Sequence, residues 1–413
     1  MSAGLFAPRK CLSGTQVCTC NLPLKYVNSR LCSTAQFNLS RVTVCVTDVK
    51  LLTSDCRRRP DCCLAHRALS ATRGKMGSSL TKPPATKWYP EFVKALPDAA
   101  FAGKTYAITG TTTGTGLVLA ATAASRGANV ILLNRKSDRA TVAVARVRSA
   151  AASGAVVTAI DCDLQSFASV LQAVVTVRKV VATTGLDVLC CNAGVMALPD
   201  AATADGYDVQ MQTNHLSHFL LVKELFPLLE LAASRRGESR VVMHTSLARK
   251  NPPYPLDAKY LGKNGGALGG DSSYLGMGAR WDRYHQTKLA NALFSHALAE
   301  KLRARGSRVK AVCAAPGLAA TQLFKTASRE GAVPTAAMEL FNAWGTQSAE
   351  DGAMPLLHAC AGVVENGELW EPGGLGHCYG LPIKVPLEPI CTDKDSQFIL
   401  WTTSEAACGK WAV

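Results

Sequence analysis

Short apolar runs alternate with longer amphipathic stretches through the central part of the chain. Short runs bounded by turn residues predict strands, and apolar residues that recur every three or four positions predict helices. Strand and helix in alternation are typical of right-handed βαβ units, so we expect an α/β fold with a single doubly wound parallel sheet and helices on both faces. In chain order, the predicted strands are 105–109, 129–134, 156–161, 186–191, 240–244 and 310–314, and the predicted helices are 116–126, 140–153, 165–183, 209–231 and one that contains Tyr284.

The same pattern divides the chain into three parts. Residues 1–75 show no sustained strand or helix period, and we expect a basic, Cys-rich leader that is disordered or is a transit peptide. Residues 76–100 contain several prolines and aromatic residues and are expected to lead into the domain and pack on it. Residues 101–413 are expected to form one domain, since a stretch of this length can bury a substantial core.

The net charge of +15 comes mainly from the leader. Residues 1–75 hold twelve Lys or Arg and three Asp, which is 12 − 3 = +9 and leaves +15 − 9 = +6 for the rest of the chain. No interleaved aromatic and basic pattern accompanies this charge, so we expect no nucleic-acid partner. A basic, acid-poor leader rich in Ser and Thr suits an organellar transit peptide, into a plastid or a mitochondrion. The alternative is an upstream extension of the reading frame, in which case the protein is expected in the cytoplasm.

Membrane attachment depends on where translation begins. No run of about 18 uninterrupted apolar residues is present, so we expect no transmembrane span. The sequence MGSSLT that starts at Met76 fits the pattern for N-myristoylation if translation begins there. A single myristoyl chain gives only marginal attachment, so the hypothesis that follows is peripheral membrane association.

The sixteen cysteines do not form a disulfide or metal pattern. Eight lie before residue 76, the other eight are scattered through the remainder, and no C-x-x-C occurs. This usage favours a reducing compartment and predicts no metal site.

A glycine-rich loop, TGTTTGTG from Thr109 to Gly116, lies between the first predicted strand and the first predicted helix. Glycines at this junction let the backbone approach a pyrophosphate that is held by the helix N-terminus. The pattern therefore predicts a dinucleotide site. The cofactor-binding residues that we expect in the loop are Gly110, Thr112, Gly114 and Gly116.

The end of the second strand bears on the choice between two nicotinamide cofactors. An acidic residue about 20 positions after the loop is typical of NAD sites, because it accepts hydrogen bonds from the ribose hydroxyls. This chain has Arg135 there, and a guanidinium matches the 2′-phosphate of NADP. NADP is therefore favoured over NAD. The alternatives are that Arg135 is a solvated loop charge, or that Asp138 supplies a displaced acid.

Tyr284 and Lys288 lie four residues apart in a predicted helix, so their side chains share a face. A tyrosine with an unperturbed pKa of about 10 needs a shift of roughly three units, or about 4 kcal/mol, to transfer protons near neutrality. A nearby ammonium group is one source of that shift. The pair is therefore a candidate acid/base device.

These residues belong to a longer series that resembles the short-chain dehydrogenase/reductase family over residues 101–410, and most closely its retinol-dehydrogenase-like branch. The branch is indicated by NAGVM at 192–196, TNHLSHF at 213–219, the stretch from Tyr284 to Asn291 and LWTTSE at 400–405. The resemblance implies a Rossmann-type fold. Beside the glycine loop, the residues that carry the family resemblance are Asp163, Leu164, Asn192, Ala193, Gly194, Asn214, Ser246, Tyr284, Lys288, Pro316 and Gly317.

The resemblance implies an NADP-dependent enzyme that interconverts a carbonyl and an alcohol on an apolar small molecule. Tyr284 would be the general acid/base, Lys288 would lower its pKa and hold the cofactor ribose, Ser246 would bind the substrate oxygen, and Asn214 would anchor a proton-relay water. The implied cofactor contacts outside the glycine loop are Arg135, Asp163, Leu164, Asn192, Ala193, Gly194, Tyr284, Lys288, Pro316, Gly317 and Thr321. The alternatives are a protochlorophyllide-reductase-like enzyme, or a non-catalytic NADP-sensing subunit associated with chloroplast import. No oligomeric state is predicted.

The sequence departs from the family in the gap of 38 residues between Ser246 and Tyr284, which is longer than usual and rich in glycine. Ser272 and Ser273 lie nearer to the tyrosine in the sequence. We expect Ser246 to be the catalytic serine, because it closes an apolar strand, whereas the other two lie in the insertion. The insertion is expected to shape or cover the substrate pocket.

Overall fold

The computed structural model describes residues 85–413, apart from 252–253, 275, 321 and 333–345. The predicted leader, the MGSSLT sequence and the first part of the lead-in, residues 76–84, lie outside the described residues. Within the described ranges, no helix has both the length and the apolar character that crossing a bilayer requires.

One central sheet organises the described residues. The strands are β1 (Thr105–Thr109), β2 (Asn129–Asn134), β3 (Val157–Asp161), β4 (Val188–Cys191), β5 (Ser239–His244), β6 (Val309–Ala314), β7 (Leu369–Pro372) and β8 (Pro382–Val385). Their order is β3-β2-β1-β4-β5-β6-β7-β8, and every neighbouring pair is parallel except β7 with β8. The predicted doubly wound sheet is confirmed. The antiparallel edge was not predicted, because β7 and β8 are short and carry prolines at their ends.

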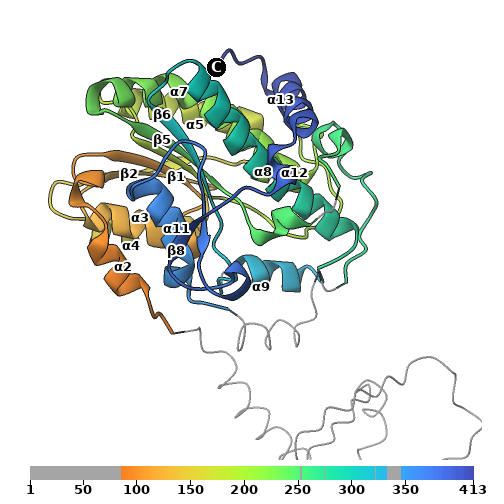
Figure 1. Ribbon diagram of the computed structural model, residues 1–413, viewed down its shortest axis with the longest axis horizontal. Coiled ribbons are helices and arrows are strands. Elements are labelled where there is room, and N and C mark those ends of the chain that lie inside the picture. Colours follow the sequence, from red (N-terminus) through yellow and green to blue (C-terminus); the bar gives the residue numbers. More distant parts are fainter. Residues whose placement is uncertain (1–84, 252–253, 275, 321, 333–345) are drawn as a thin grey trace, which may run out of the picture. The chain divides into compact units, whose positions relative to one another are not determined.

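Helices cover both faces of this sheet (Figure 1). One apolar core joins the sheet to α3 (Gly114–Ser125), α4 (Asp138–Ala150) and α11 (Ala349–Ala361), with α2 (Tyr89–Ala95) beside α11. A second core, on the other face, joins it to α5 (Phe167–Val180), α7 (Ser217–Arg236) and α8 (Ala279–Ala304), with α12 (Pro389–Thr392) and α13 (Lys394–Cys408) against α8. The helix α9 (Gln322–Arg329) and the short helical turns η3 (Asp98–Ala100), η5 (Leu247–Lys250), η6 (Ala258–Leu261) and η7 (Leu375–His377) complete the description.

Helix starts are set by capping side chains, which explains where they differ from the predicted bounds. The Ser137 hydroxyl accepts a hydrogen bond from the Ala140 N–H, so α4 starts at 138 instead of 140. The Ser166 hydroxyl accepts one from the Ser169 N–H, so α5 starts at 167 instead of 165. The lead-in is held by Asp351, whose carboxylate accepts hydrogen bonds from three successive backbone N–H groups, those of residues 87–89, at 2.8, 3.0 and 2.9 Å.

The predicted single helix at 209–231 is three segments. They are α6 (Val209–Met211), a wider π-helical turn η4 (Gln212–Leu216), and α7. The predicted single helix is therefore wrong in this detail. A π turn adds one residue to a helix, and the apolar period of the sequence is too coarse to register that addition. The turn contains Asn214, one of the predicted site residues.

Candidate active site

Most of the predicted site residues meet in a cleft of about 1130 Å³ at the carboxyl ends of the central strands. The described residues of the predicted set that line it are Gly110, Thr112, Gly114, Arg135, Asp163, Leu164, Asn192, Ala193, Gly194, Ser246, Tyr284, Lys288, Pro316 and Gly317. Gly116 and Asn214 lie behind this lining, and Thr321 lies outside the described residues. Parallel α/β sheets bind ligands at this edge, where the strand order reverses between β1 and β4.

The glycine loop is packed so closely that side chains would not fit. Gly110 has a φ of +70°, and a Cβ added there would lie 2.8 Å from the Cα of Ala193. A Cβ added at Gly116 would overlap both the Asn192 amide nitrogen and the Gly110 carbonyl oxygen, at less than 3.0 Å. Gly114 and Thr115, at the N-terminus of α3, line the cleft, and the preceding Thr113 makes no side-chain capping bond, so this N-terminus can face an anion.

Two asparagines beside this loop use their side chains for hydrogen bonds to the loop itself. Asn134, at the end of β2, accepts a hydrogen bond from the Thr111 N–H and donates one to the Thr111 hydroxyl, each at 2.7 Å. The Asn192 amide donates to the carbonyl oxygens of Thr109 (2.9 Å) and Gly110 (3.1 Å) and accepts from the Thr115 hydroxyl (3.0 Å). The role of Asn134 was not predicted from the sequence, because both bonds reach a residue 23 positions away.

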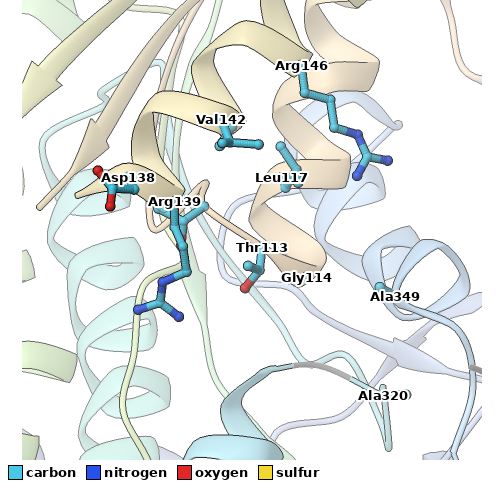
Figure 2. A pocket seen from close by; sticks show the side chains of 11 residues that line it. Thr113, Gly114, Leu117, Asp138, Arg139, Val142, Arg146, Ala320 and Ala349 are labelled. Atoms are coloured by element: carbon cyan, nitrogen blue, oxygen red, sulfur yellow. The ribbon is translucent and has the colours of Figure 1, made fainter. Parts of the chain in front are cut away.

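Basic side chains gather at one end of the cleft. Arg135, Lys136 and Arg139 line it and are exposed. Arg139 also borders a smaller hollow of about 490 Å³ between α3 and α4, where Thr113 and Gly114 face Arg139 and Val142 (Figure 2). Within the described part of the chain, the guanidinium groups of Arg135 and Arg139 have no hydrogen-bond or ion-pair partner. Arg139 was not predicted from the sequence, although its position four residues after Arg135, at the start of the predicted helix, was a usable signal.

Tyr284, Lys288 and Ser246 meet at the other end of the cleft. Tyr284 and Lys288 are one turn apart on α8, and each is only 4% exposed. The Ser246 side chain lies close enough to the Tyr284 hydroxyl to affect its pKa. Ser246 also caps η5, since its hydroxyl accepts the Ala248 N–H at 3.2 Å. The Lys288 ammonium donates to the His244 carbonyl oxygen at 3.2 Å and lies 5.8 Å from the centre of the Tyr284 ring.

The pKa of Tyr284 is shifted in the direction opposite to the expected one, which was a decrease caused by Lys288. Burial raises the pKa of Tyr284 to about 12, although the Ser246 side chain opposes this rise. Burial also lowers the pKa of Lys288 to about 8. The pKa of Tyr284 therefore lies above its usual value, because burial outweighs the opposing effect of Ser246. At neutral pH Tyr284 is a phenol that can donate a proton.

Asn214 supports the site from behind. Its side chain is fully buried, accepts the Val195 N–H at 2.8 Å and donates to the Val195 carbonyl oxygen and the Thr287 hydroxyl, each at 2.9 Å. With these contacts Asn214 bridges the backbone of Val195 and the Thr287 hydroxyl. They tie the end of β4 to the helix that carries Tyr284. The role of Asn214 as anchor of a proton-relay water stays a prediction.

The wall of the cleft around Tyr284 is largely apolar. The described residues that line the cleft include six Asp, Glu, Lys or Arg residues. Five of them lie at the ends of β2 and β3 or just after those strands, and Lys288 is the one that lies near Tyr284. Trp281 packs edge-on against Tyr284, with ring centres 6.1 Å apart. Apolar side chains from several elements, which complete the wall, are Met196, Leu247, Ala248, Met277 and Leu323.

The hydroxyls of Ser272 and Ser273, the two serines of the insertion, form hydrogen bonds away from Tyr284. The Ser272 hydroxyl accepts the Ala279 N–H at 3.0 Å, at the start of α8. The Ser273 hydroxyl accepts the Trp281 indole N–H at 3.0 Å and donates to the Ala332 carbonyl oxygen at 2.7 Å. Neither residue is among those that line the cleft within the described ranges. Of the three serines, the geometry brings Ser246 to the tyrosine.

Comparison with known proteins places this site in context. The family described as short chain dehydrogenase matches residues 104–261. Retinol dehydrogenase 14 of Mus musculus is 32% identical over 318 residues, which cover 74% of this chain and 86% of the mouse protein. The chloroplastic short-chain dehydrogenase TIC 32 A of Brassica napus is 32% identical over 225 residues, 53% of this chain and 64% of that protein.

A solved structure agrees with these matches. A crystal structure of an uncharacterised protein from Mycobacterium paratuberculosis is 28% identical, covers 80% of this chain and 100% of its own, and has a TM-score of 0.58. Several of the curated relatives are matched over 62% to 64% of their own length.

Proposed function

Because the chain belongs to the short-chain dehydrogenase/reductase family, in its retinol-dehydrogenase-like branch, we propose that it is an NADP(H)-dependent oxidoreductase that interconverts a carbonyl and an alcohol on an apolar small molecule. The observation that carries this proposal is that Tyr284, Ser246 and Lys288 together line one end of a cleft, while the glycine loop and three basic side chains line the other end.

The cleft residues fit a dinucleotide. Gly110 lets the loop pack directly on Ala193, with no room for a Cβ, and the N-terminus of α3 at the cleft suits a pyrophosphate. Gly194 lines the cleft near Lys288. A Cβ added there would lie 3.2 Å from the Asn214 side-chain oxygen and 3.5 Å from the Lys288 ammonium. Backbone there can approach a ligand as closely as it does at the loop.

NADP is the cofactor that the basic end favours. Arg135 and Arg139 are the two guanidinium groups that line the cleft, neither has a protein partner among the described residues, and Lys136 lies between them in the sequence. A bidentate guanidinium suits the 2′-phosphate that distinguishes NADP from NAD. Asp138 lines only the smaller hollow, which gives little support to the alternative of a displaced acid.

The bound nicotinamide would supply the hydride, and the side chains of this chain would handle the oxygen and its proton. Ser246 would donate a hydrogen bond to the substrate oxygen as negative charge develops on it. Tyr284 would give its phenolic proton to that oxygen in reduction and take it back in oxidation. Lys288, still an ammonium at neutral pH, would favour the phenolate form of Tyr284 through its charge. Trp281 and its apolar neighbours would exclude water from the reacting oxygen.

The experiment is an assay of NADPH oxidation by the purified full chain with retinal, straight-chain aldehydes and ketones. Tyr284→Phe removes the proton donor, and we expect it to lower kcat by a factor on the order of 10²–10⁴, the range typical of general acid–base catalysis. Tyr274→Phe is the matched control, because Tyr274 is 67% exposed and does not line the cleft. Activity in Tyr284→Phe equal to that of the wild type would overturn the mechanism.

The same assay separates the alternatives. Turnover that occurs only with protochlorophyllide under illumination would favour a protochlorophyllide-reductase-like enzyme. Binding of NADPH without turnover, together with cofactor-sensitive capture of partner proteins, would favour a sensing subunit. The plastid and transit-peptide hypotheses draw some support from the relative named chloroplastic, and the N-terminal mass of the native protein tests them.

A further inference from the structure

The segment 262–278, which leads into the helix of Tyr284, is held in place although its composition is typical of a flexible loop. It contains seven glycines, and five of them have a positive φ, which other residues adopt rarely. Gly265 packs so closely on the neighbouring loop that a Cβ there would lie 2.6 Å from the backbone of Tyr207. We call residues 262–278 the glycine-rich segment.

Asp200 binds the backbone N–H groups of this segment. One carboxylate oxygen accepts the Gly266 N–H at 3.0 Å, and the other accepts the N–H groups of Leu268 (2.7 Å) and Gly270 (3.0 Å). The carboxylate side chain is only 6% exposed. Three N–H donors on a buried carboxylate form a strong, charge-assisted set of bonds.

Arg283 binds the carbonyl groups of the same stretch. Its guanidinium donates to the carbonyl oxygens of Gly270 (2.8 Å) and Leu268 (3.2 Å). The side chain is fully buried and lies 3.6 Å from the Asp200 carboxylate and 3.5 Å from that of Asp208. Since Arg283 is the residue before Tyr284, the glycine-rich segment is tied directly to the helix turn that carries the candidate catalytic tyrosine.

The far end of the segment forms part of the cleft wall. Tyr274 and Met277 exchange backbone hydrogen bonds at 2.9 and 2.8 Å, and Gly276 and Met277 line the cleft beside Trp281. The Trp281 indole is bonded to Ser273. Asp200 and Arg283 thus hold residues 266–270, and the bond between Ser273 and Trp281 ties the segment to α8 a few residues before Gly276 and Met277.

We propose that Asp200 and Arg283 are positioning residues that hold the glycine-rich segment as a fixed wall, and that this wall makes the site selective for long apolar carbonyl substrates over short ones. The proposal rests on the proposed function. A short aldehyde needs only Tyr284 and Ser246, whereas a long one also packs against Met277 and Trp281.

The first test is Asp200→Asn in the full chain. This change keeps the shape of the side chain but removes its charge and replaces one accepting oxygen by an NH₂ group. Depending on how the amide is turned, either Gly266 or both Leu268 and Gly270 lose their acceptor. Hydrogen exchange at the amides of residues 266, 268 and 270 is expected to speed up by at least about tenfold, the factor that about 1.4 kcal/mol of lost protection produces. Asp257→Asn is the matched control, since Asp257 caps η6 just before the segment. Unchanged exchange in Asp200→Asn, or equal acceleration in the control, would overturn the proposal.

The second test is the ratio of kcat/KM for decanal to that for propanal. In Asp200→Asn we expect the ratio to fall by at least about tenfold, with the KM for NADPH unchanged. Met277→Ala is expected to lower the same ratio while exchange at 266–270 stays as in the wild type, which keeps the test available if Asp200→Asn does not fold. A parallel loss for both aldehydes would indicate a general structural role and refute selectivity. If the wild type reduces no carbonyl compound, the proposed function and the selectivity both fail, and exchange still decides whether the pair holds the segment.

Discussion

Gly116→Ala tests whether the glycine loop has the tight packing that a cofactor cradle needs. Gly116 lies in the first turn of α3. Alanine in place of glycine inside a helix normally stabilises a protein by roughly 0.5–1 kcal/mol. Here the added Cβ would overlap the Asn192 amide and the carbonyl oxygen of Gly110. The structure therefore predicts the opposite sign.

The expected loss of unfolding free energy can be estimated from the groups that the new methyl group would displace. Forcing a methyl group into a packed site costs about 1–3 kcal/mol. Displacing the Asn192 amide also weakens its bonds to Thr109 and Gly110, each worth roughly 0.5–1.5 kcal/mol. After the gain in helix propensity is taken off, we expect a loss of about 2–4 kcal/mol in unfolding free energy. Because the loop itself shifts, affinity for NADPH should fall at least about tenfold.

The measurements are urea denaturation and NADPH titration by fluorescence. Gly127→Ala is the matched control at the other end of α3. Its φ is +87°, and an added Cβ would meet only the Cα of Ala102, at 3.7 Å. It should cost about 1 kcal/mol through backbone strain and leave NADPH affinity unchanged. Wild-type stability and affinity in Gly116→Ala would refute the packing argument.

Two further predictions concern the reacting end of the cleft. Ser246→Ala should lower kcat by about 10²–10³, as the loss of one oxyanion donor does, while Ser272→Ala should leave kcat within about threefold; the reverse result would assign the site to the insertion. The kcat/KM for NADPH-dependent reduction should fall about tenfold per pH unit above about 8, because the Lys288 ammonium loses its proton there. Lys288→Arg keeps its charge to higher pH, so a fall near pH 8 that persists in this variant would exclude Lys288 as its cause.

The glycine loop and the alternation of strands and helices from residue 105 to residue 314 were predictable, and the reason is local. A run of apolar residues, a turn of glycines and the next helix lie within about a dozen residues, so their pattern is legible in the chain. The same holds for Tyr284 and Lys288, whose shared face follows from helix geometry alone. Arg135, directly after β2, could be proposed as a cofactor contact for the same reason, because its distance along the chain from the glycine loop is short.

The supports of the site were not predictable in this way. Asn134 and Thr111 are 23 residues apart, and Asn214 and Thr287 are 73 apart. Side chains at such separations meet only after the sheet and its helices have packed. Asn and Thr side chains also bond equally well to water, caps and turns, so their residue type alone does not specify a partner.

By itself, the sequence of this protein determined the order of strands and helices, the dinucleotide loop and the helix that pairs a tyrosine with a lysine, because each depends on neighbours along the chain. Only the tertiary structure decided that burial raises the pKa of Tyr284, that Asn214 lies in a π turn behind the cleft, and that Asp200 and Arg283 bond to the glycine-rich segment. Burial and long-range hydrogen bonds depend on which surfaces the fold brings together. The hydrophobic pattern of a sequence indicates whether a segment is a strand or a helix, but it does not give the distances between side chains on different elements.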